Sequence, residues 1–251
     1  SWFFLPGLLA ALLAACQPTP TAVVLADDEA IRMKSLTEKM MTRCAGRYLI
    51  DLPEKFVLNP VHRTVIEGVD LNLEPITRRG FDLNHEARRR ELASTMLPPE
   101  RVLPHLRSSI AVPDPAVGSV FDRSKSDANS SRLGRTLELL AWRDGFQIKA
   151  SIDATDTTFP EDANDSIVKQ LRTNVPEKLA HLLNVFERTR GLRDGEVPAE
   201  AGVCMCNGFV RGQASEKEDV IVNFRLKDVE DVEFTVHTIG DLKQENELLD
   251  R

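Results

Sequence analysis

Cysteine and histidine are the side chains of this sequence whose types and positions could carry chemistry. Zinc sites are built from closely spaced ligand pairs such as C-x-x-C and H-x-x-x-H. The sequence has no C-x-x-C pair, and no histidine lies close to Cys204 or Cys206. A metal site is therefore the less favoured interpretation, and no cofactor is expected. The cysteines are Cys16, Cys44, Cys204 and Cys206, and the histidines are His62, His85, His105, His181 and His237.

The cysteines also allow a disulfide. Cys204 and Cys206 are separated by one residue, which is too close for a comfortable bridge between them. If Cys16 is set aside for the reason given below, three thiols remain, enough for one intramolecular bridge with one thiol left over. A bridge from Cys44 to either Cys204 or Cys206 would close a loop of about 160 residues, which the chain-entropy model values at ~4–5 kcal/mol.

The motifs of common enzyme classes are missing from the sequence. There is no Gly-x-Ser-x-Gly element, no phosphate-binding loop and no dinucleotide fingerprint. His85-Glu86-x-x-Arg89 lacks the second histidine of a zinc protease motif. The abundant carboxylates would support an envelope hydrolase only if the fold gathered titratable groups in a cleft. We therefore expect a protein that is not an enzyme.

The first 16 residues predict the cellular location of the protein. The segment carries no charge, and the first charged residue is Asp27. It is too short to span a bilayer, which needs ~20 apolar residues, but it has the length of a signal-peptide core. It ends in Leu13-Ala14-Ala15-Cys16, which matches a bacterial lipobox. We expect cleavage before Cys16, lipid on its thiol and a tether over residues 17–30; a buried apolar helix is the alternative.

The start of the sequence departs from a complete signal peptide. It has neither an initiator methionine nor basic residues ahead of the apolar run, which we interpret as a truncated start. The net charge of the whole chain is −7, which argues against nucleic acid as a partner. The expected protein is therefore a lipid-anchored envelope protein that faces the periplasm.

Hydrophobic periodicity predicts a mixed α and β fold. The strongest signal is a hairpin over residues 134–154, where two alternating runs flank Asp144-Gly145. Residues 97–127 are rich in Pro, Ser and Asp and are predicted to be loop. Further strands are predicted at 47–53, 56–58, 64–73, 202–204, 208–210, 220–226 and 232–238. Helices are predicted at 27–43, at 84–95 with Asn84 as N-cap, and at 165–190 with a kink or a new start at Pro176.

A break at Gly195–Ala199 divides this pattern into two domains. Residues 31–195 form the N-terminal α+β domain, and residues 196–251 begin a C-terminal domain that we expect to be truncated. Both are expected to contain antiparallel sheets with packed helices. A second region of roughly 55 residues is small for a core without a disulfide.

Two blocks of residues resemble a known family. Cys44-Ala45-Gly46-Arg47-Tyr48-Leu49-Ile50-Asp51-Leu52-Pro53-Glu54, preceded by Leu36-Thr37-Glu38-Lys39-Met40, resembles the N-terminal domain of Tli-type immunity proteins of type VI secretion. Gly202-Val203-Cys204-Met205-Cys206-Asn207-Gly208-Phe209 resembles the start of that family's C-terminal domain. Such proteins neutralise a phospholipase effector.

The resemblance implies a periplasmic protein that binds a secreted lipase and protects the producing cell. It implies structural cysteines, with Cys44 and Cys204 at the matching positions and thus the preferred bridge. Cys206 is an additional thiol and the alternative partner of Cys44. The lipobox agrees equally with a general structural or assembly lipoprotein of the envelope, which is the alternative function.

An immunity protein of this kind would act by occlusion. It would block substrate entry or lid movement in the lipase, and a few buried anchors would supply most of the affinity. An acidic surface would suit a partner with basic patches. Phe81, Phe121 and Phe159 are candidate exposed anchors, although each could equally pack in the core.

Overall fold

A computed structural model describes residues 27–95, 104–125, 133–158, 168–215, 217–227, 229 and 232–240. Contacts divide the chain into two units, residues 1–39 and 40–251. The described part of the first unit is α1 (Asp27–Thr37), in which the Thr37 hydroxyl donates to the Met33 carbonyl over 3.0 Å. The predicted helix over 27–43 is therefore too long, because residues 40–43 begin a strand. None of the helices in the described residues is long and apolar enough to cross a bilayer.

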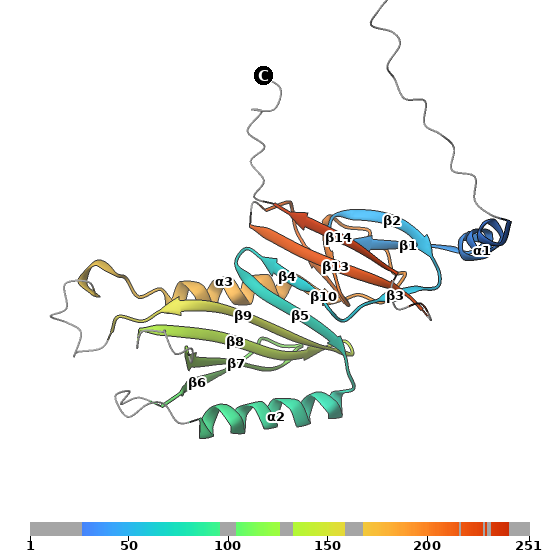
Figure 1. The fold of residues 1–251 in the computed structure, drawn as a ribbon. Helices are drawn as coiled ribbons and strands as arrows, with labels where there is room; N and C mark the ends of the chain where they lie inside the picture. The colour runs from blue at the N-terminus through green and yellow to red at the C-terminus, as the bar shows by residue number, and fades with distance from the viewer. Residues whose placement is uncertain are drawn as a thin grey trace, which may run out of the picture. The chain divides into compact units, whose positions relative to one another are not determined.

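The second unit is built on a nine-stranded antiparallel sheet (Figure 1). Its order is β14-β13-β4-β5-β9-β8-β7-β6, and β3 pairs with β13. The β8–β9 hairpin confirms the prediction over 134–154, and its turn residues Asp144 and Gly145 have φ of 52° and 89°. The strands are β3 (Phe56–Leu58), β4 (Arg63–Ile66), β5 (Val69–Pro75), β6 (Leu106–Ala111), β7 (Val117–Ser124), β8 (Gly134–Arg143), β9 (Phe146–Thr155), β13 (Glu218–Leu226) and β14 (Glu233–Ile239).

Two smaller antiparallel sheets accompany it. One pairs β1 (Met40–Ala45) with β2 (Tyr48–Pro53). The other has the order β10-β12-β11, from β10 (Thr189–Gly191), β11 (Gly202–Met205) and β12 (Gly208–Arg211). Antiparallel sheets thus dominate the described chain, and helices are few. The expected α+β class is therefore only loosely supported: antiparallel sheets and packed helices are both present, but the strands greatly outnumber the helices.

Alternation along the strands gives the large sheet two unlike faces. On the inner face, α3 (Val175–Arg188) buries Leu182, Val185 and Phe186 in the main core, which includes Leu137, Leu139 and Ala141 of β8. On the outer face, α2 (Arg78–Ser94) packs on β7 and β8. Its residues Phe81 and Leu92 form a hydrophobic cluster with Phe121 of β7 and Leu140 of β8. Figure 1 shows the two helices on opposite sides of β8 and β9.

Three sequence predictions are corrected here. α2 begins after Thr77, whose hydroxyl accepts from the Gly80 amide over 3.2 Å, so the N-cap is not Asn84. The predicted loop over 97–127 contains β6 and β7, because Val120 and Phe121 are fully buried in the sheet. The helix predicted over 165–190 is shorter in the structure, where α3 follows the single turn η2 (Val168–Gln170). The alternative of a new start at Pro176 is confirmed, because Pro176 lies in the first turn of α3, where its missing amide costs no helical bond.

The strands on either side of residues 195 and 196 belong to one sheet. β13, from the second region, pairs with β4 over Glu218–Ile221 and with β3 over Phe224–Leu226. The division into domains at this point stays a prediction.

Candidate functional site

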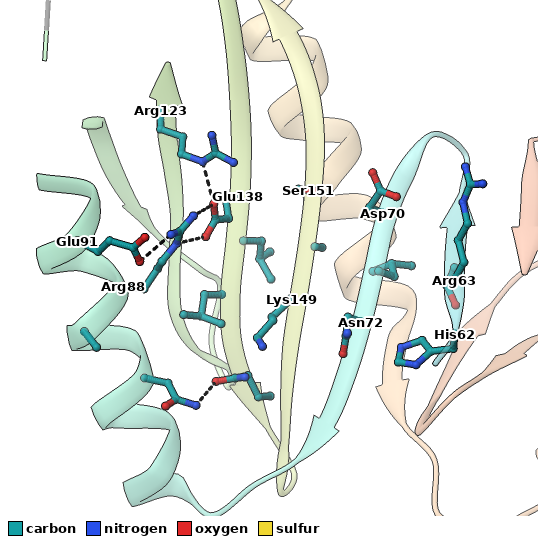
Figure 2. A pocket seen from close by; sticks show the side chains of 18 residues that line it. His62, Arg63, Asp70, Asn72, Arg88, Glu91, Arg123, Glu138, Lys149 and Ser151 are labelled. Atoms are coloured by element: carbon teal, nitrogen blue, oxygen red, sulfur yellow. Dashed lines mark hydrogen bonds and ion pairs between the residues drawn. The ribbon is translucent and has the colours of Figure 1, made fainter. Parts of the chain in front are cut away.

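The outer face of the large sheet holds a polar groove of about 740 Å³ (Figure 2). α2 packs mainly on β7 and β8, so most outward side chains of β9, β5 and β4 remain open beside it. Groove volumes of this size are typical of ligand-binding sites. The polar residues that line it are His62, Arg63, Thr64, Asp70, Asn72, Asn84, Arg88, Glu91, Arg123, Glu138, Gln147, Lys149 and Ser151.

The wall along α2 is a network of arginines and carboxylates. Arg88 donates to both oxygens of Glu138, over 2.6 and 2.7 Å, and pairs with Glu91 at 2.7 Å. Arg123 donates to the same Glu138 carboxylate over 2.8 Å. Burial acts to raise the pKa of Glu138, but the hydrogen bonds from Arg88 and Arg123 outweigh it and hold the pKa below its ordinary value. These arginines are therefore neutralised within the fold.

On the opposite wall, the lining residue Arg63 belongs to a second set of paired charges, whose other members lie outside the lining. Asp219 of β13 pairs with Arg63 of β4 at 3.4 Å and accepts a hydrogen bond from His237 of β14 over 2.8 Å. His237 therefore points outward on its strand. No group of three or more His, Cys, Asp or Glu residues able to hold a metal occurs in the described parts of the chain.

Strand register arranges the floor of the groove in rows. Ser151 of β9 lies opposite both Asp70 of β5 and Glu138 of β8, so a small side chain separates two carboxylates. In the next row, Lys149 lies between Asn72 and Leu140, and its ammonium pairs with Glu74 at 3.2 Å. Figure 2 shows Asp70, Asn72 and Lys149 projecting from this floor.

The cysteines lie away from the groove. A disulfide joins Cys44 of β1 to Cys204 of β11, with 5.6 Å between their Cα atoms, and backbone hydrogen bonds connect Gly46 with Cys204 over 2.8 and 2.7 Å. Cys206 is a buried free thiol, and burial raises its pKa to about 11. A thiol with this pKa is almost wholly protonated at neutral pH and is a poor nucleophile. Cys16 lies outside the described residues.

The aromatic residues considered as exposed anchors do not serve that role. Phe81 and Phe121 are buried, at 1% and 0% exposure, because they hold α2 to the sheet, and Phe159 lies outside the described residues. The groove itself was not predicted. Its only signal is the polar side chain at every second position of residues 70–74 and 147–151, a pattern that any solvated strand face shows.

Two family models match the chain. The model described as the Tle cognate immunity protein 4 N-terminal domain matches residues 41–191. The model of the C-terminal domain of the same protein matches residues 196–251. No curated protein is similar enough in sequence to match.

Solved structures with a similar fold are immunity proteins. The apo immunity protein TplEi of the type VI secretion system from Pseudomonas aeruginosa has a TM-score of 0.55 and 15% identity, over 74% of this chain and 56% of that one. The Tle4–Tli4 complex gives 0.55 and 14%, over 74% and 55%. TplEi with an "L" peptide gives 0.50 and 15%, over 84% and 63%. The chain therefore spans less than two thirds of the structures that it matches, and at this identity the likeness shows the fold alone.

Proposed function

The chain belongs to the family of the Tle cognate immunity protein 4, and we propose that it binds and occludes a type VI secretion lipase effector. The observation that carries the proposal is the match of both family models, in order, over residues 41–191 and 196–251. One solved structure with a similar fold is a Tle4–Tli4 complex. The same kind of complex is proposed for this chain.

Occlusion requires a rigid binding surface rather than catalytic groups. The groove fits this need, because its arginines are already paired with Glu138, Glu91 and Asp219. An effector bound here would meet a preformed surface, which lowers the entropy lost on binding.

We further propose that the protein works in the periplasm, anchored by lipid on Cys16. The support is the sequence Leu13-Ala14-Ala15-Cys16 after an uncharged apolar run. An anchored inhibitor would be held near the phospholipid that an incoming lipase attacks.

Co-expression tests function and location together. The lipase tested is the one encoded by the gene next to that of this chain. It would be directed either to the periplasm or to the cytoplasm and expressed with and without this chain. We expect survival to be restored only for the periplasmic lipase, and the purified pair to form a stoichiometric complex without lipase activity. Absence of binding and of protection would overturn the proposal and favour the envelope assembly lipoprotein instead. Protection against the cytoplasmic lipase alone would overturn the location.

A further inference from the structure

We propose that the groove binds an extended polypeptide segment of the lipase, with a peptide unit on the amides of Asn72 and Gln147 and a basic side chain at Asp70. The inference rests on the proposed function and deepens it, because it assigns the partner's docking site to one face of the sheet. Every residue that it uses lies within the match to the N-terminal family model.

Two amide groups in the floor have unused hydrogen-bonding atoms. Gln147 is 0% exposed, and its carbonyl oxygen accepts from the Asn84 side chain over 3.2 Å. No group in the described chain accepts a hydrogen bond from its Nε2, and none donates to the buried Oδ1 of Asn72. Buried polar atoms are almost always paired, so this donor and this acceptor would each gain a hydrogen bond from a ligand seated in the groove.

Register places these two residues side by side on one face of the sheet. Asn72 lies opposite Lys149, and Gln147 is the next outward residue on the same strand. Asn72 and Gln147 are therefore diagonal neighbours on one face, with Cα atoms about 7–8 Å apart. A peptide unit offers one carbonyl to Gln147 and one N–H to Asn72, which is the complement that the floor lacks.

Asp70 adds a charge preference. Its side chain is exposed, and within the described residues it forms no hydrogen bond or ion pair. Ser151, the small residue beside it, leaves room for an incoming side chain. A lysine or arginine of the partner would pair with Asp70 there.

The same lining disfavours a free anion as the occupant. Arg63, Arg88 and Arg123 already pair with carboxylates, and Lys149 pairs with Glu74. An anion would have to break these pairs, whereas a polypeptide with both donors and acceptors needs no such rearrangement.

Matched substitutions test the site against the purified lipase. Asp70→Lys is compared with Glu177→Lys, an equal charge change on the exposed side of α3. Ala87→Trp, which fills the groove from α2, is compared with Ala180→Trp, an exposed position of α3. We expect each groove variant to raise the Kd at least about tenfold and each control to leave it within about twofold, by calorimetry.

Gln147→Leu gives a test that does not depend on disrupting the fold. It removes the unpaired donor and also the acceptor of the Asn84 side chain, which is exposed and can bond to water instead, so we expect a melting temperature close to that of the wild type together with weaker binding of the lipase. A photo-crosslinking residue at position 87 should capture a segment of the lipase, and the same residue at position 180 should not.

The possible failures can be told apart. If the wild-type chain does not bind the lipase, the proposed function fails. If it binds, but the three groove variants bind equally well, or the crosslink at position 87 captures lipid or a second copy of this chain, the groove assignment fails alone.

Discussion

His85 lies on the buried side of α2, where its ring centroid is 5.5 Å from that of Phe81 and 5.3 Å from that of Phe121. Its Nε2 is 3.1 Å from the Ser119 hydroxyl. Burial lowers the pKa of His85 below 6.5; Glu86 and Asp82 oppose this shift, and Arg89 adds to it. The imidazole therefore resists protonation in the folded protein.

Stability should consequently depend on this residue only in acid. Well above pH 6.5, His85 is neutral in both states and has no effect on the pH dependence. As the pH falls from 6.5 through the lowered folded pKa, the unfolded state takes up the proton first, so the free energy of unfolding decreases. His85→Gln should lose less stability than the wild type between about pH 7.5 and pH 5, measured by urea unfolding at each pH. An equal loss in both proteins would contradict the assignment.

At the scale of elements, local patterns predicted those parts of the fold that local chemistry decides. The β8–β9 hairpin follows from Asp144-Gly145 between two alternating runs. β7 was missed because its buried residues include Asp122 and Ser124, polar groups whose burial depends on other strands. Asp122, for example, is paired with Arg135 of β8 at 2.6 Å. No local pattern contains that contact.

The start of α2 gives a direct test of this point. Thr77→Ala removes the side chain that accepts from the Gly80 amide and should lower the free energy of unfolding by about 1 kcal/mol. Asn84→Ala, at the N-cap expected from sequence, should cost less, because alanine is favourable inside a helix and only the contact with Gln147 is lost. Urea unfolding of both variants measures the difference, and the reverse ranking would place the cap at Asn84.

The groove could not be predicted for the same reason. Glu138 and Ser151 lie on one predicted hairpin, but Asp70 is far from both in sequence, and only the pairing of β5 with β9 brings it beside them. The disulfide partner of Cys44, by contrast, could be predicted from the sequence. Spacing left two partners for Cys44, and the resemblance to a family favoured Cys204, the residue to which the structure joins it.

At the scale of the whole molecule, the disulfide connects the two regions that the family models match. Cys44 and Cys204 are separated by 160 positions, and the bridge lies beside the backbone contact of Gly46 with Cys204. Its loss should therefore affect the entire 40–251 unit rather than one element.

Replacing both cysteines by alanine should lower the free energy of unfolding by about 2–5 kcal/mol. Guanidinium unfolding measures this effect. Cys206→Ala, which keeps the bridge, should cost only about 1 kcal/mol. A reductant should destabilise the wild type but not the double variant; equal sensitivity of the two proteins would show that the bridge contributes nothing.

The pairing of β13 with β4 also has a consequence for folding. β4 ends at Ile66, and its partner strand is complete only at Leu226. Until that segment pairs with it, β4 is a strand edge with unpaired amides and carbonyls, and such edges promote aggregation. Contacts between distant segments also form slowly. A chain that already contains the whole groove therefore still has an open edge at β4 until the segment Glu218–Ile221 pairs with it.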